Sequence, residues 1–318
     1  MTTRGRIDTH HHITPPDYRD WLLSRGESAG GLPVPPWSAG SDLAFMDSQE
    51  IATAVLSVST PGTHLGDDAE ARHWARKVND YAAETVKARP DRFGFFATLP
   101  LPDVDGALDE AARALDELGA DGVILLANHR GTYLGDPAFE PLMAELGRRG
   151  TTVFVHPAAL PGPTTPGIPP FAADFLLDTV RAAMNLTLSG TTTRHPDIVF
   201  LLSHGGGFLP YAAHRISLTL EIHQQVTGAH PVMDRETLLA QLRRFFFDTA
   251  LSANPDTLPN LLAFADPARI TFGSDYPHAT AEGAAYVTGQ LDAHPLDIAR
   301  RTAVDRGNAE VLFPRLAS

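Results

Sequence analysis

Cysteine is absent from the 318 residues of this chain, so neither a disulfide bond nor a thiolate metal ligand can form. Any metal ion that the chain binds must be held by histidine, aspartate or glutamate. Apolar runs are also short, and none approaches the ~20 residues that a membrane-spanning helix needs. We therefore expect a protein of the cytoplasm that has no membrane partner.

Positive charge is scarce as well. The chain has 25 lysine and arginine residues against 38 aspartate and glutamate residues, which gives a net charge of -13. So acidic a chain repels phosphate backbones, and we expect no nucleic-acid partner. A small anionic substrate stays compatible with this charge, because a bound divalent cation can dominate the field inside a site.

The composition of the chain indicates a globular protein with a sizeable core, since 43% of the residues are hydrophobic and 20% are charged. Short apolar or β-branched runs recur along the chain, and most are continuous, which is typical of parallel strands buried on both faces. Helical periodicity separates these runs. The predicted strands are 6–9, 51–59, 93–99, 122–127, 151–156, 198–204, 245–249 and 269–275, and the predicted helices are 74–85, 104–118, 136–150, 171–189, 209–225, 256–265, 281–293 and 308–316.

This alternation of strand and helix predicts a single α/β domain over residues 1–318, folded as a (β/α)8 TIM barrel. A doubly wound open sheet is the alternative, and the positions of the polar residues described next favour the barrel. Segments near 24–40 and 157–170 are rich in proline and glycine, and each follows a strand end. We expect loop insertions there, either lids over the barrel mouth or ordinary surface loops.

Histidine and aspartate stand where several predicted strands end. Side chains alternate along a strand, so His10 and His12 point the same way after the first run, while His11 points opposite. The carboxyl ends of barrel strands meet on one face, so we expect residues at other strand ends to join them. These residues are His156 at the fifth strand, His204 at the sixth and Asp275 at the eighth.

Three imidazoles and one carboxylate suit zinc, and also manganese or iron. Such a set leaves a further position for a water molecule or a substrate oxygen. We expect one divalent metal ion, zinc in the first place and manganese in the second. His204 is a candidate general acid or base, because the ordinary pKa of imidazole lies near neutrality. Asp248 is either a partner of a ligand or a residue of a helix cap or turn, and His278 either touches substrate or packs in a loop.

Four motifs resemble the amidohydrolase superfamily, in the amidohydrolase-2 branch that contains aminocarboxymuconate-semialdehyde decarboxylase and 6-methylsalicylate decarboxylase-like enzymes. They are IDTHHH at 7–12, VHP at 155–157, SHGGG at 203–207 and FGSDYP at 272–277, and the resemblance covers essentially the whole chain. The resemblance implies a homodimer. It also implies one metal ion per chain, since the carboxylated lysine that bridges two metals elsewhere in the superfamily has no evident counterpart here. It further implies that His10, His12, His156 and Asp275 hold the metal and that His204 is catalytic.

By this resemblance the chain is a metal-dependent, non-oxidative decarboxylase of a small aromatic or unsaturated carboxylic acid. The muconate-semialdehyde decarboxylases have a substrate-binding arginine before their second strand, whereas residues 41–47 contain none here, which favours a salicylate-like acid. In that reaction a protonated Asp275 would deliver a proton to the ring carbon, and His204 would orient Asp275 or exchange the proton. A metal-dependent hydrolase of a lactone or similar ester is the alternative, because the same metal-bound water and base serve both reactions.

Overall fold

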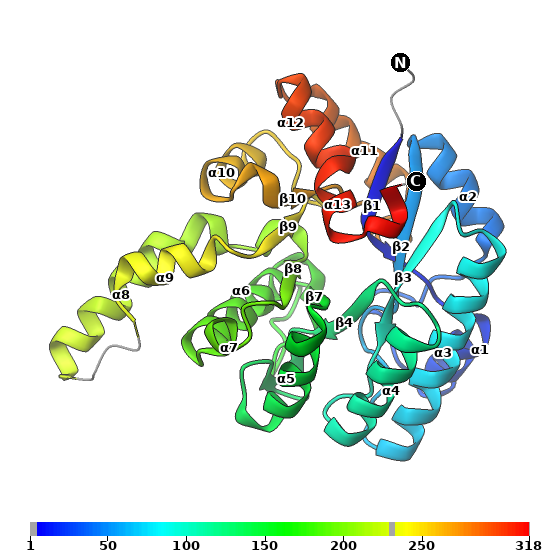
Figure 1. Cartoon of the computed structure of the whole chain (residues 1–318), viewed down its shortest axis with the longest axis horizontal. Coiled ribbons are helices and arrows are strands. Elements are labelled where there is room, and N and C mark those ends of the chain that lie inside the picture. Colours follow the sequence, from blue (N-terminus) through cyan, green and yellow to red (C-terminus); the bar gives the residue numbers. More distant parts are fainter. Residues whose placement is uncertain (1–4, 229–232, 318) are drawn as a thin grey trace.

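Eight parallel strands form one sheet at the centre of the structure, a computed structural model that describes residues 5–228 and 233–317. The strand order is β1-β2-β3-β4-β7-β8-β9-β10, with helices outside the sheet (Figure 1). The strands are β1 (Arg6–His12), β2 (Ile51–Ser57), β3 (Phe93–Thr98), β4 (Gly122–Leu126), β7 (Thr152–His156), β8 (Val199–Leu202), β9 (Phe246–Asp248) and β10 (Ile270–Thr271).

Backbone hydrogen bonds join the segment after β10 to β1 and nearly close the barrel. Thr9 N donates to Phe272 O at 2.9 Å, and His12 N donates to Tyr276 O at 2.7 Å. Each predicted run overlaps one strand of this sheet, so the predicted (β/α)8 barrel is confirmed and the open-sheet alternative is wrong.

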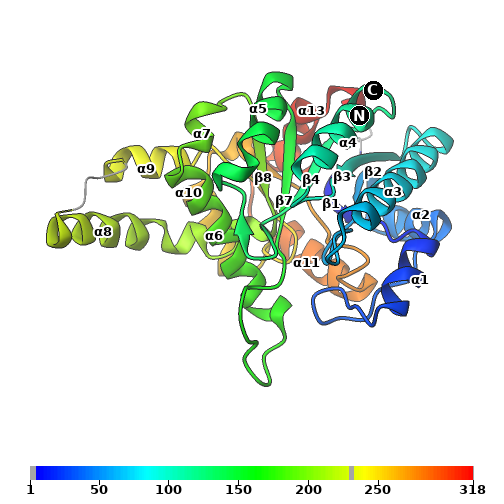
Figure 2. The same cartoon turned by 90° about the horizontal axis from the view of Figure 1, so that it is seen from below.

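Helices follow most of the strands and cover the outside of the barrel. Figure 2 shows that α8 and α9 lie together and project from the barrel as an arm. Within the described ranges, no helix is both long and apolar enough to pass through a bilayer. The helices are α1 (Pro16–Ser24), α2 (Ala39–Ser48), α3 (Asp68–Ala88), α4 (Val104–Asp116), α5 (Glu140–Arg149), α6 (Asp174–Leu188), α7 (Thr191–Arg194), α8 (Leu209–Thr227), α9 (Arg235–Leu242), α10 (Thr257–Phe264), α11 (Ala281–Ala293), α12 (Ile298–Thr302) and α13 (Asn308–Leu312).

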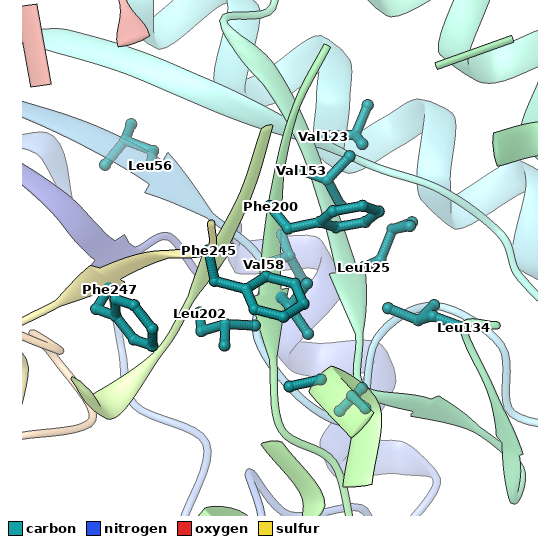
Figure 3. Packing of buried hydrophobic residues seen from close by; sticks show 14 of the residues in the cluster. Leu56, Val58, Val123, Leu125, Leu134, Val153, Phe200, Leu202, Phe245 and Phe247 are labelled. Atoms are coloured by element: carbon teal, nitrogen blue, oxygen red, sulfur yellow. The ribbon is translucent and has the colours of Figure 1, made fainter. Parts of the chain in front are cut away.

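Alternate residues of the strands build two apolar cores. On β7, Val153 and Val155 belong to the larger core between strands and helices, while Phe154 belongs to a smaller core. Figure 3 shows part of the larger core, where Phe200 and Phe245 lie close together. The smaller core fills the barrel, because it takes one side chain from each of seven strands: Ile7, Val55, Phe96, Ile124, Phe154, Leu201 and Phe246.

The structure differs from the prediction at several elements. Helices α2 and α9 and the two-residue strands β5 (Asn128–His129) and β6 (Thr132–Tyr133) were not predicted. The last strand ends at Thr271, short of the predicted end at Asp275, because the backbone N–H of Phe272 donates to the Val304 carbonyl outside the sheet, at 2.9 Å. Asp275 itself, at φ 61°, is not extended. The first strand is longer than predicted and reaches His12.

An irregularity in β1 decides which of its side chains face the barrel interior. Ile7 lies in the interior core, so strict alternation would bring Thr9 and His11 inward. The register between β1 and β2 shifts between Asp8 and His11, as in a β-bulge. This shift turns His10 and His12 inward, onto the face where β7 places His156.

Candidate metal centre and active-site cavity

The five predicted site residues meet at the carboxyl end of the barrel, and all are buried. One ligand atom each from His10, His156, His204 and Asp275 lies within 4.8 Å of the others. His12 joins this cluster, since its Nε2 lies 3.0 Å from His10 Nε2 and 3.1 Å from Asp275 Oδ1. Residues from four strand ends therefore surround one point.

Three of the imidazoles are oriented through Nδ1. His10 Nδ1 donates to Asp248 Oδ2 at 2.6 Å, and His156 Nδ1 donates to the carbonyl of Pro157 at 2.9 Å. His12 Nδ1 lies 3.2 Å from the Ser57 carbonyl, which accepts its proton. A neutral imidazole that donates from Nδ1 keeps a lone pair on Nε2, and this lone pair is what a metal ion needs.

These lone pairs fit a divalent cation. The Nε2 atoms of His10 and His12 face each other at 3.0 Å, and Asp275 Oδ1 lies 3.2 and 3.1 Å from them. Acceptor atoms brought this close repel one another unless a positive charge lies between them. The nitrogen and oxygen donors suit zinc or manganese, so the residues present fit the predicted metal.

The pKa shifts of His12, His156 and Asp275 also suit a metal ion, whereas at His10 a metal ion must displace a proton from the ring. Burial lowers the pKa of His12 to about 3 and holds the pKa of His156 well below its ordinary value. Burial opposes charge on His10 as well, but Asp248 and Asp275 outweigh it and raise the pKa of His10 to about 10. Burial would raise the pKa of Asp275, but the imidazoles, His10 first, hold that pKa well below its ordinary value. Asp275 is therefore a carboxylate, as a metal ligand must be.

His204 lies beside the cluster in a strained backbone conformation. Its φ of 53° falls in the left-handed region, which costs a non-glycine residue about 1–2 kcal/mol. Its Nε2 lies 3.5 Å from Asp275 Oδ2, and its buried Nδ1 has no hydrogen-bond partner within the described part of the chain. Gly207, three residues on, also has positive φ, and a Cβ there would lie 2.3 Å from the Leu176 carbonyl oxygen. This glycine is required for the turn that presents His204.

Asp248 connects His10 with the backbone of His204. Its Oδ2 accepts from His10 Nδ1, and its Oδ1 accepts from the backbone N–H groups of His204 and Ala250, both at 2.9 Å. Asp248 is therefore the partner of the predicted ligand His10 and also, through Ala250 two residues on, part of a turn. Gly273 allows this approach, because a Cβ at that position would lie 2.8 Å from His10 Cβ.

His11 points to the other side of β1, as predicted, into a buried polar network that the sequence did not reveal. Its Nδ1 donates to Asp8 Oδ2 at 2.9 Å, and its Nε2 donates to Asp42 Oδ2 at 3.1 Å. Trp37 Nε1 also donates to Asp42 Oδ2, at 2.6 Å. Burial lowers the pKa of His11, but Asp42 and Asp8 outweigh it and raise that pKa to about 9. The sequence analysis predicted neither partner: adjacency in the motif could have indicated Asp8, whereas Asp42 lies on α2, which was not predicted.

A cavity of about 690 Å³ opens over the cluster and reaches His156, His204, Asp275 and His278. The ring of His278 lies 4.8 Å from that of His12, so His278 is a wall of this cavity. Ala29 and Leu32, from the first proline- and glycine-rich segment, line the mouth, as does Phe171, which follows the second. Within the described residues, no lysine or arginine lines the cavity.

Comparison with known proteins identifies the family. The family model described as Amidohydrolase (Amidohydro_2) matches residues 7–315. The 6-methylsalicylic acid decarboxylase of Penicillium expansum is 39% identical over 98% of this chain and 97% of its own. A crystal structure of an amidohydrolase II superposes with a TM-score of 0.88 at 28% identity, covering 97% of this chain and 99% of that one. A 2,6-dihydroxybenzoate decarboxylase, solved with 2,6-dihydroxybenzoate, superposes with a TM-score of 0.82 at 25% identity, over 98% and 99%. The chain therefore belongs to the Amidohydro_2 family of amidohydrolases.

Proposed function

We propose that the chain is a metal-dependent, non-oxidative carboxy-lyase that releases carbon dioxide from a 2-hydroxybenzoic acid. The absence of lysine and arginine from the described cavity wall carries this proposal, because it leaves the metal cluster as the anchor for an anionic substrate. A 2-hydroxybenzoate offers a carboxylate and an adjacent oxygen to such an anchor. The likeness to a 6-methylsalicylic acid decarboxylase over 98% of the chain supports the same reaction.

We propose that His10, His12, His156 and Asp275 hold one metal ion, zinc in the first place and manganese in the second. When bound, this ion would supply the positive charge that holds the substrate carboxylate and neighbouring oxygen. The two oxygens of Asp275 have different surroundings. Oδ1 faces His10 and His12, while Oδ2 faces His204, so one oxygen can serve as ligand and the other can handle a proton.

The proton chemistry follows from the lowered pKa of Asp275. We expected a protonated Asp275, but its resting form is the carboxylate, so its proton must come from the substrate. Asp275 takes the proton of the ortho hydroxyl and passes it to the ring carbon that carries the carboxylate. The carbon–carbon bond then breaks, its electron pair returns to the ring, and carbon dioxide leaves. His204 orients Asp275 and supplies the proton that converts the phenolate product to the phenol.

Carbon dioxide release from salicylates by the metal-loaded protein tests this proposal. We expect His204→Asn to lower turnover by about 10²–10⁴-fold with unchanged metal content. His73→Asn, at an exposed position on α3, is the matched control and should retain activity. Normal turnover by His204→Asn would remove His204 from the mechanism. Opening of a lactone to its acid, without carbon dioxide release from any salicylate, would favour the hydrolase.

We also propose a homodimer formed through the projecting arm of α8. Tyr211 and Val226 on this helix are 80% and 79% exposed, and Leu218 and Ile222 between them are also exposed. Their spacings of seven and four residues place these four side chains along one side of the helix. Light scattering after size-exclusion chromatography should give twice the 34.2 kDa chain mass, and Ile222→Lys with Val226→Lys should give the monomer. A wild-type monomer at micromolar concentration would contradict this proposal.

We propose that residues 1–318 act as one domain, which the family match over residues 7–315 supports. The net charge of -13 supports the proposed lack of a nucleic-acid partner. We place the protein in the cytoplasm, and microscopy of the tagged protein in its source cell would test that location.

A further inference from the structure

We infer that the substrate ring carries an apolar substituent larger than methyl, held against one wall of the cavity. This inference rests on the proposed function and names the substrate class more closely. A cavity of about 150 Å³ is enough to bind a benzene ring. The cavity here measures about 690 Å³, so a salicylate with only a methyl group would leave most of it unfilled.

The lining residues of the cavity fall into two groups that differ in chemistry. One group forms an apolar wall and consists of Ala29, Leu32, Phe171, Phe175, Leu176 and Phe208. The other group forms a mainly polar wall from the segment after β9 and the start of α10, with Ser252, Asn254, Asp256, Thr257 and Asn260 beside the apolar Leu251. The charge of Asp256 disfavours a carboxylate at that wall, so the acid group of the substrate belongs at the metal end. An apolar substituent then has one wall available to it.

The apolar wall begins at the metal cluster. The ring of Phe175 lies 6.4 Å from that of His156, centroid to centroid, so a substituent next to the reacting carboxylate meets Phe175 first. Gly30 packs directly on this ring, since a Cβ at position 30 would lie 2.2 Å from Phe175 Cζ. Backbone hydrogen bonds between Ala29 and Leu32, at 2.9 and 3.1 Å, hold that turn in place. The start of the wall is therefore formed without the substrate.

The same wall continues outward to the rim of the cavity. Phe171 and Phe208 line the cavity and are still 40% and 41% exposed. Exposed aromatic side chains at a cavity rim gain stability when an apolar ligand covers them. A linear alkyl chain on the ring would run from Phe175 past Leu32 to these two residues. A methyl group would reach only the inner part.

A series of 6-alkylsalicylates, from salicylate itself through 6-methyl to 6-pentyl, tests the inference by carbon dioxide release from the metal-loaded protein. We expect kcat/KM to rise about two- to fourfold per added methylene until the chain reaches the rim. A maximum at 6-methyl, or a fall from there on, would overturn the inference and leave the proposed function intact. Failure of every member to release carbon dioxide would instead overturn the proposed function.

Two variants test whether the apolar wall holds the alkyl substituent. Phe171→Ala should reduce the kcat/KM ratio of the 6-pentyl to the 6-methyl compound about three- to tenfold, because the outer wall is lost. Tyr286→Ala, which removes an exposed aromatic ring on α11 away from the cavity, should leave that ratio unchanged. Inhibition by the 3-alkylphenol products gives a readout that needs no turnover. It should strengthen with chain length in the wild type and in Tyr286→Ala, and less steeply in Phe171→Ala. Equal ratios in both variants would place the substituent elsewhere and contradict the inference.

Discussion

The two faces of strand β1 carry the same residue type with opposite chemistry. His12 faces the metal cluster, where burial lowers its pKa to about 3 and leaves a neutral ring. His11, one residue earlier, lies between Asp8 and Asp42, which raise its pKa to about 9 against the effect of burial and keep the ring charged. Both rings are fully buried, so burial alone does not decide the charge. The charge of the ring depends on how many carboxylates face it and on whether they accept hydrogen bonds from both of its nitrogens.

The difference separates a ligand from a structural cation. On the inner face, His10 and His12 each donate from Nδ1 to an acceptor outside the cluster, so Nε2 is the atom proposed to bind the metal. At His10 the metal must displace the proton that Asp248 and Asp275 favour on this ring. On the outer face, both nitrogens of His11 donate to carboxylates, so no lone pair remains. We therefore expect the outer face to stabilise the fold beneath the site, and we propose that the inner face holds the metal ion. Substitutions on the two faces should separate metal binding from stability.

The largest effect is expected on the inner face. His12→Ala removes one proposed ligand, so metal content should fall from about one equivalent to a small fraction and turnover should fall about 10³-fold or more. Metal analysis of untagged protein, with the variant and the wild type prepared in parallel, measures both. Thermal unfolding of the variant serves as the control for folding. Full metal content in His12→Ala would exclude His12 as a ligand and favour the alternative set of His10, His156, His204 and Asp275.

On the outer face, Asp42→Asn should affect stability and spare the metal. It removes one of the two carboxylates that balance the buried charge of His11, and breaking a buried pair of this kind costs about 3–5 kcal/mol. Denaturant unfolding should show a loss of this size, while the folded variant keeps its metal content. Loss of metal in parallel with stability would mean that the two faces are not independent.

The charge on His11 also predicts how stability depends on pH. The pKa of His11 is about 9 in the folded chain, above the ordinary 6.5. Below pH 6.5 both the folded and the unfolded states bind the proton, so the charged ring makes its full contribution to the free energy of unfolding. Between pH 6.5 and 9 only the folded state keeps the proton, so stability should fall as pH rises, by at most about 1.4 kcal/mol per pH unit. Asp42→Asn should flatten this slope, measured with saturating metal. An equal slope in both proteins would assign the dependence to another group.

Substitution of Asp248 tests the inner face of β1 without removing a proposed metal ligand. Asp248 accepts the proton of His10 Nδ1 at 2.6 Å and so fixes the ring that presents Nε2. Asp248→Asn should weaken metal affinity about 10–100-fold, as for other carboxylates that orient a metal-binding histidine. Competition with a chelator of known affinity measures the change. An unchanged affinity would show that β1 alone positions His10.

The sequence predicted the architecture well because most strands lie in continuous apolar runs, which can be recognised without knowing which distant residues they contact. It missed α2, whose residues Ala39–Ser48 follow a proline-rich segment and include Gly40, Ser41 and Ser48, which favour turns. It also missed β5 and β6, since strands of two residues carry no periodicity. These elements form through contacts with the rest of the fold, and no local pattern encodes them.

At the site, the sequence identified the residues and missed what orients them. The alternation of His10, His11 and His12 predicted that two rings share a face, and the structure agrees. Strict alternation from the inward-facing Ile7 would predict that Thr9 and His11 face the interior. The register shift between Asp8 and His11 reverses this alternation, so the sequence alone could not identify the inner face. The pairing of His11 with Asp42 joins residues 31 positions apart on different elements, so only the folded chain brings them together.

The smallest effect is expected where a histidine and a carboxylate meet at the surface. His195 Nε2 donates to Glu140 Oε1 at 2.8 Å, closer than the 3.1 Å between His11 and Asp42, and Arg194 joins this surface pair. The Glu140 side chain is 38% exposed, so water screens the interaction that it forms. Glu140→Gln should therefore lower the free energy of unfolding by less than about 1 kcal/mol, against several for Asp42→Asn. Denaturant unfolding of both variants under one condition decides this, and equal losses would show that burial does not set the strength of these pairs.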